Sequence, residues 1–97
     1  MSDQYNVNSL VKSVAVSTSS QTVTFPQGFL SVRVFGTKLT DTAFIRSGNT
    51  GVVAAATDFP IGSAIESFDI NPTDDTLAII SPLGTGTVYF CFSAGGK

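Results

Sequence analysis

The sequence contains no histidine, no tryptophan and a single cysteine, Cys91. Without an imidazole group, neither a Ser–His nor a Cys–His nucleophile pair can form, and the side chain that titrates nearest to neutral pH is absent. One thiol without histidine cannot complete a tetrahedral zinc site, and it excludes an intrachain disulfide. We therefore expect a protein that is not an enzyme, that carries no cofactor and that folds in a reducing compartment.

Charge is also scarce, at 12% of the residues, with five basic and seven acidic side chains. The basic residues are scattered along the chain, so no patch is available to neutralise the phosphates of a nucleic acid. No apolar run reaches the roughly 18 residues that a membrane-spanning helix needs. We expect no direct contact with nucleic acid or with a membrane. The basic residues are Lys12, Arg33, Lys38, Arg46 and Lys97.

The polar part of the composition is hydroxylic, because serine and threonine together supply 24 of the 97 residues. Apolar residues make up 42% of the chain and the mean hydropathy is +0.30, values that argue against a disordered chain. Charged side chains protect exposed strand edges from association, and this chain has few of them. This favours the interpretation that the protein is a subunit whose edges are covered by neighbours in an assembly. The alternative is a small free domain whose hydroxyl groups suffice for solubility.

Two segments, 30–36 and 87–93, have the alternating pattern of half-buried strands. In the second segment Val88, Phe90 and Phe92 share one face, while Tyr89 and Cys91 share the other. Cys91 lies within this aromatic run, so we predict a small core side chain, with a reactive thiol as the alternative.

Weaker strand patterns occupy 10–17, 21–25, 43–47, 64–70 and 76–81. Turn residues separate them at intervals of about 8–12 residues, the spacing found in sandwiches and barrels. The sequence therefore predicts an all-β chain: a single small β-sandwich or jelly-roll-like barrel of about seven or eight antiparallel strands. This domain is expected to span 10–97, after a flexible N-terminal arm at 1–9 for which a frayed terminus is the alternative.

Three connections carry specific predictions. Residues 59–62 contain Pro60 and Gly62 and are predicted to form a loop. Residues 82–86 are predicted to form the hairpin between the last two strands, since a strand follows the Gly-Thr-Gly at 84–86 where a phosphate-binding loop would need a helix. Asp74 and Asp75 lie close to a proline and are predicted to form a turn, with a calcium site as the alternative.

Five residues are candidates for a protein interface. Arg33 and Phe35 share one face of the predicted strand 30–36, and Phe44 and Arg46 share one face of 43–47. If the opposite faces form the core, these aromatic side chains are exposed; if the sheet is covered on both sides, they belong to the core. Glu66 is a candidate partner for Arg33 or Arg46 across a sheet, the alternative being that each charge points to solvent.

Six short motifs follow one another between residues 30 and 92. They are Ser-Val-Arg-Val-Phe at 31–35, Thr-Ala-Phe-Ile-Arg-Ser-Gly at 42–48, Thr-Asp-Phe-Pro-Ile at 57–61, Ala-Ile-Glu-Ser-Phe at 64–68, Leu-Ala-Ile-Ile-Ser at 77–81 and Gly-Thr-Gly-Thr-Val-Tyr at 84–89. In this order the motifs resemble a group of short structural proteins encoded among the virion genes of tailed bacteriophages. The chain departs from the group at 36–39, where an Asn-containing turn is usual, and at Ser47, where an aromatic residue is usual.

The resemblance implies a β-sandwich subunit of the phage particle, most directly a capsid decoration or cement protein that binds and stabilises the head lattice. Its implied partners are the major capsid protein or other virion proteins and further copies of itself, a trimer being one form. The implied location is the virion, after synthesis in the host cytoplasm, and no catalytic or metal-binding residue is carried over. The alternative is a tail, neck or fibre module that recognises a host surface or another virion protein.

Overall fold

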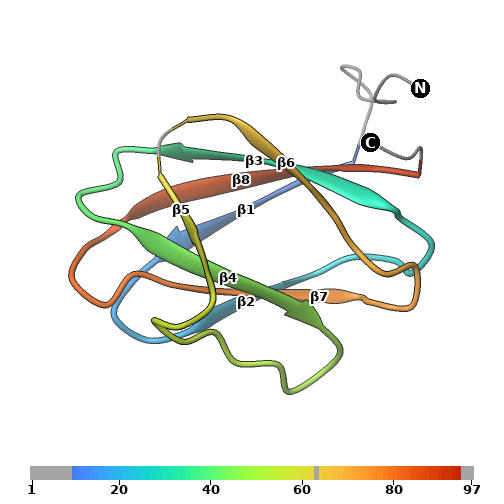
Figure 1. The fold of residues 1–97 in the computed structure, drawn as a ribbon, viewed down its shortest axis with the longest axis horizontal. Helices are drawn as coiled ribbons and strands as arrows, with labels where there is room; N and C mark the ends of the chain where they lie inside the picture. The colour runs from blue at the N-terminus through green and yellow to red at the C-terminus, as the bar shows by residue number, and fades with distance from the viewer. Residues whose placement is uncertain (1–9, 63, 95–97) are drawn as a thin grey trace.

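Eight strands make up the fold in the computed structural model, which describes residues 10–62 and 64–94 (Figure 1). In chain order they are β1 (Val11–Val16), β2 (Gln21–Thr24), β3 (Ser31–Thr37), β4 (Ala43–Gly48), β5 (Phe59–Ile61), β6 (Glu66–Asp69), β7 (Thr76–Ile80) and β8 (Gly86–Ser93). The all-β prediction is confirmed, whereas the arm predicted at 1–9 lies outside the described residues. Nothing in the described part of the chain is a helix long and apolar enough to span a bilayer.

The strands form two antiparallel sheets that face each other. Sheet A has the order β1-β8-β3-β6 and sheet B the order β2-β7-β4-β5. The strand pairing is that of one long hairpin in which β1 pairs with β8, β2 with β7, β3 with β6 and β4 with β5. Two further pairs, β3–β8 and β4–β7, roll this hairpin into two sheets. This connectivity is that of a jelly roll. In Figure 1 the two layers are seen with β5 and β6 on the near side.

The alternating pattern places one face of each sheet in the core. Val32 and Val34 of β3 lie opposite Phe92 and Phe90 of β8, and all four side chains are buried. The ring of Phe25 stacks on Phe92 with the two ring centroids 4.3 Å apart. Burial of one such aromatic side chain stabilises the fold by about 1.5–3 kcal/mol. The period of two in the sequence therefore reflects the burial of one side of each strand.

Two predictions about connections are wrong. Residues 59–61 form the edge strand β5 rather than a loop, and Pro60 lies opposite Phe44 of β4. An edge strand tolerates proline because one side of its backbone has no strand to bond. Residues 82–86 do not form a hairpin, because β7 belongs to sheet B and β8 to sheet A, so this segment crosses between the sheets.

The connection between β4 and β5, residues 49–58, lies across the outer face of sheet B. The Ala54 N–H donates a hydrogen bond of 3.0 Å to Oγ of Ser20, which directly precedes β2, and Ala54 is buried. Ala78 of the central strand β7 pairs with the exposed Arg46, so it lies on the outer side of the sheet, yet it is fully buried. The 49–58 connection thus adds a third layer over sheet B.

Candidate functional site

The five interface candidates lie on different surfaces of the molecule. Arg33 and Phe35 alternate with buried valines of β3 and lie on the outer face of sheet A. Phe44 and Arg46 alternate with buried residues of β4 and lie on the outer face of sheet B. Glu66 is exposed at the start of the edge strand β6. The two aromatic–arginine pairs therefore face away from each other and do not form one site.

The ion pairs predicted with Glu66 do not form. Strands β3 and β6 are neighbours, but the register places Arg33 opposite Ser67, so Arg33 and Glu66 point to opposite sides of sheet A. Arg46 belongs to the other sheet, where its Nε donates to Oδ1 of Asp58 at 3.0 Å.

Exposed apolar side chains gather on the outer face of sheet A. Phe35 of β3 and Tyr89 of β8 are direct cross-strand neighbours and are 39% and 42% exposed. Val11 of β1 is 52% exposed and pairs with Cys91, which pairs in turn with Arg33. Cys91 is a free, half-buried thiol on this outer face, so the prediction of a core side chain is wrong. Val11, Phe35, Tyr89 and Cys91 together are called the sheet A patch below.

Part of the outer face of sheet B is covered by the chain itself. Asp58 fastens the 49–58 connection: its Oδ1 accepts from Arg46 and its Oδ2 accepts the Ala55 N–H at 2.7 Å. Phe44 is half-buried and lines a notch together with Ala56 of this connection. Among the described residues, no connection lies across Phe35 and Tyr89 in the same way. Of the two outer faces, that of sheet A is therefore the one on which exposed aromatic side chains remain among the described residues, whereas the exposed Phe59 lies on the inner side of β5 beside the opening between the sheets.

We expect Asp58→Ala to loosen the 49–58 connection and to lower the free energy of unfolding by about 1–2 kcal/mol, because two hydrogen bonds to a mostly buried carboxylate are lost. The measurement is urea unfolding followed by circular dichroism. Asp69→Ala is the matched control, since it removes an exposed carboxylate of β6 and is expected to cost less than about 0.5 kcal/mol. Equal losses in the two variants would show that Asp58 does not fasten the connection.

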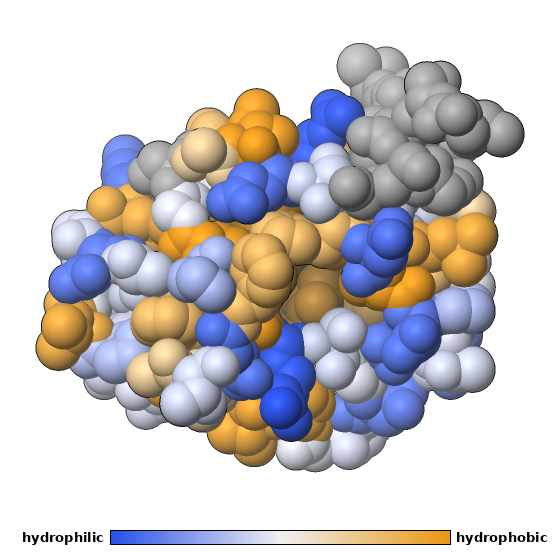
Figure 2. Space-filling model, in the orientation of Figure 1, coloured by the Kyte–Doolittle hydropathy of each residue, from blue (hydrophilic) through white to orange (hydrophobic). Residues whose placement is uncertain are grey.

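A hollow opens between the two sheets on the side where β5 and β6 form the edges. Its volume is about 280 Å³, and Figure 2 shows the surface recessed near the middle of this side. The buried side chains of Val32 and Leu77 line it, and Phe59 and Phe68 meet edge to face at its wall with ring centroids 4.6 Å apart. The hollow exists because β5 and β6 are short and do not close this side of the sandwich.

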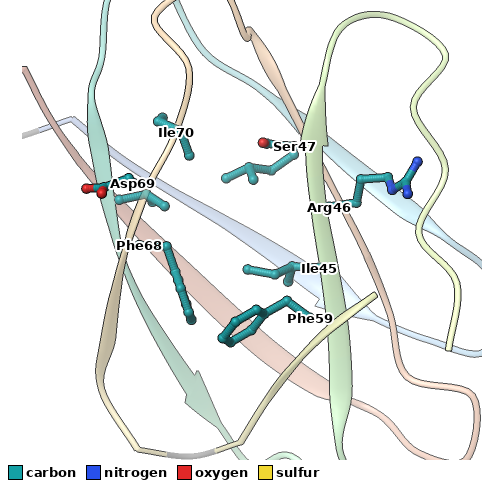
Figure 3. Close-up of a pocket in the computed structure, with 9 residues that line it drawn as sticks. Ile45, Arg46, Ser47, Phe59, Phe68, Asp69 and Ile70 are labelled. Atoms are coloured by element: carbon teal, nitrogen blue, oxygen red, sulfur yellow. The ribbon is translucent and has the colours of Figure 1, made fainter. Parts of the chain in front are cut away.

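The charged groups around the hollow turn away from it. In Figure 3 the Arg46 and Asp69 side chains point outward, while Phe68, Phe59 and Ile45 point inward. The remaining polar lining group is Ser47, whose Oγ already donates to Oδ2 of Asp74 at 2.9 Å. Such a site accepts an apolar group, and it presents no convergent acid, base or nucleophile for a reaction.

The acidic pair Asp74 and Asp75 serves the turn before β7. Asp74 is 7% exposed, its N–H donates to the Asn71 carbonyl at 3.0 Å, and its carboxylate accepts from Ser47. Oδ1 of Asp75 accepts from the Thr76 hydroxyl at 2.9 Å. The described residues contain no group of three or more acidic, cysteine or histidine side chains placed to hold a metal ion. The hydrogen bond from the Asp74 N–H to the Asn71 carbonyl closes the predicted turn.

Comparison with known proteins adds no relative: no family model, no curated protein and no solved structure matches the chain. The two sheets thus define an all-β sandwich with jelly-roll connectivity, an architecture that hosts many different functions.

Proposed function

We propose that this chain is a structural subunit of a bacteriophage particle, a decoration protein that binds the head lattice through the sheet A patch. The difference between the two outer faces is the observation that supports this proposal. Sheet B lies under its own 49–58 connection, whereas Phe35 and Tyr89 stand side by side and exposed on sheet A. Paired exposed aromatic residues are typical of the centre of a protein interface.

The composition supports the same proposal. With 12% charged residues, the chain has few groups that would have to lose their hydration on docking. A subunit present in many copies on a lattice gains avidity, so each individual contact can be small. The motifs between residues 30 and 92 resemble, in their order, those of phage virion proteins. This resemblance is the reason for proposing a phage head as the lattice. Jelly rolls are also a common architecture of viral capsid proteins, which agrees with the proposal at the level of fold.

We expect the double variant Phe35→Ser/Tyr89→Ser to bind purified phage heads at least about 30-fold more weakly, because an aromatic side chain at the centre of an interface contributes about 2 kcal/mol or more. The double variant should still be folded at the temperature of the binding assay, since both side chains lie outside the core. The measurement is co-sedimentation of the purified protein with undecorated heads. Leu83→Ser is the control, because it removes a loop side chain that is 82% exposed. Binding that survives the double variant and is lost with Leu83→Ser would overturn the assignment to sheet A.

The copy number in purified particles tests the functional class itself. Quantitative mass spectrometry should find hundreds of copies of a decoration protein in each particle. About a dozen copies would replace the proposal by the tail or neck alternative. Absence from the particle would exclude both.

A further inference from the structure

The two sheets have four edge strands, and three of them carry a residue that opposes pairing with another strand. On β1, Lys12 lies opposite the buried Phe90, so this charge is on the inward side of the edge. On β6, Glu66 lies opposite the buried Val34 and is likewise on the inward side. Strand β5 contains Pro60, which has no N–H to donate. Inward charges and proline are the devices by which natural sheets prevent edge-to-edge association.

The fourth edge, β2, carries no such device. Its sequence is Gln-Thr-Val-Thr, and it pairs with β7 along its whole length. In an antiparallel edge strand every second residue directs its N–H and C=O away from the neighbouring strand. The Thr22 and Thr24 side chains on the outer side of β2 are exposed. Strand β2 therefore offers backbone groups and β-branched side chains to a further strand.

Strand β2 and the segment that crosses its start carry no charge. Asp75 lies beside the other end of β2, where its carbonyl accepts the Phe25 N–H at 2.9 Å. The chain has no charged residue over 13–32 and none over 47–57. The hydrogen bond from Ala54 to Ser20 brings these two segments together at the start of β2. Next to Ala54, Val53 is 64% exposed. The start of the edge is thus bordered by hydroxyl and small apolar side chains, and Asp75 precedes β7, one strand in from the edge.

We propose that β2 is a self-association edge, where a second copy of this chain adds its own β2 antiparallel across a two-fold axis. A second copy is the partner that the charges favour. Self-pairing of β1 would bury the inward-facing Lys12 of each copy at the joined edge, and self-pairing of β6 would place Glu66 of one copy opposite Asp69 of the other. Self-pairing of β2 juxtaposes no charge at all, and it joins two copies of sheet B into one continuous sheet.

The contact is small, because each copy contributes a strand of four residues and the neighbouring Val53. An interface well below about 1,200 Å² is weak in dilute solution. We therefore expect dimers at about 100 µM to 1 mM protein and monomers at low micromolar concentration. Copies held next to each other on a lattice would pair at much lower bulk concentration. This contact is separate from the sheet A patch, so it stands or falls independently of the proposed function.

The test is sedimentation velocity over this concentration range with the full chain and two variants. Thr22→Lys/Thr24→Lys places charges on the β2 edge and is expected to weaken dimerisation at least tenfold. Ser13→Lys places a charge at an equally exposed position on the β1 edge and is expected to leave dimerisation unchanged. Hydrogen exchange should show β2 amides that become protected as the concentration rises. A wild-type chain that stays monomeric at 1 mM would overturn the proposal, and so would a dimer that resists the double lysine variant but is lost in Phe35→Ser/Tyr89→Ser.

Discussion

Phe92→Ala is expected to lower the free energy of unfolding by about 3–5 kcal/mol, the cost of replacing a fully buried aromatic side chain by alanine. Phe92 is 1% exposed in β8, the strand that lies between β1 and β3 in sheet A. Its ring centroid is 4.3 Å from that of Phe25 and 5.5 Å from that of Phe29, so the substitution leaves a cavity at the centre of an aromatic cluster. Because domains of this size are stable by about 5–15 kcal/mol, the variant is expected to be close to unfolding at 37 °C.

Urea unfolding followed by circular dichroism measures this loss, and Tyr89→Ala is the matched control. Tyr89 lies three residues away in the same strand but on its outer face, so its removal should cost about 1 kcal/mol or less. If Phe92→Ala proves insoluble, Phe92→Leu keeps most of the volume and should lose less than about 1.5 kcal/mol. Equal losses from Phe92→Ala and Tyr89→Ala would contradict the division of β8 into an inner and an outer face.

Gly86→Ala is expected to lower the free energy of unfolding by about 3 kcal/mol, through backbone strain of about 1–3 kcal/mol and overpacking of similar size. Gly86 has a φ of 152°, a conformation that residues with a side chain rarely adopt. A Cβ atom there would lie 2.8 Å from Cα of Leu39. The Leu39 backbone cannot easily yield, because the next residue, Thr40, donates its N–H to the Thr85 carbonyl at 3.0 Å.

Gly28→Ala separates the two contributions to this loss. Gly28 has a φ of 109°, but a Cβ atom added to it would meet nothing within 4 Å. Its expected cost is therefore the strain alone, about 1–2 kcal/mol, measured by the same denaturation experiment. A loss in Gly86→Ala no larger than that in Gly28→Ala would show that the contact with Leu39 relaxes freely.

The strands with one buried face could be predicted because apolar side chains occur at every second residue of such a strand. Residues 87–93 show this clearly, and the structure places Val88, Phe90 and Phe92 inside and Tyr89 outside, as expected. Strand β5 could not be found in this way, because three residues with a central Pro60 carry no period. The turn residues at 82–86 predict a hairpin where the structure has a crossing, because they show where a strand ends but not which sheet receives the next one.

For the candidate site, the sequence predicts which residues share a face of one strand, but it does not predict which residues of other strands lie beside them. Alternation puts Phe35 on the strand face opposite Val32 and Val34 but leaves open whether that face is exposed, and only the pairing of β3 with β8 brings Tyr89 beside it. The candidate ion pair between Arg33 and Glu66 does not form because Arg33 lies opposite Ser67, one residue away from Glu66. The register between two strands is not specified by the local pattern of either strand. The hollow likewise depends on the lengths of two edge strands that are far apart in the sequence.

The place of β8 in the fold has a consequence for how the chain is made. Sheet A is assembled around its C-terminal strand, because β8 is the one described strand that pairs with β1, and β3 pairs with β8 along its whole length. During synthesis, β1 therefore waits without its partner until residues 86–93 have left the ribosome. Topologies dominated by such distant pairings fold in milliseconds to seconds, and their nascent chains expose strands in the meantime. A nascent chain that ends before residue 86 therefore lacks the strand that carries Phe90, Phe92 and Tyr89, and it completes neither the aromatic core nor the sheet A patch.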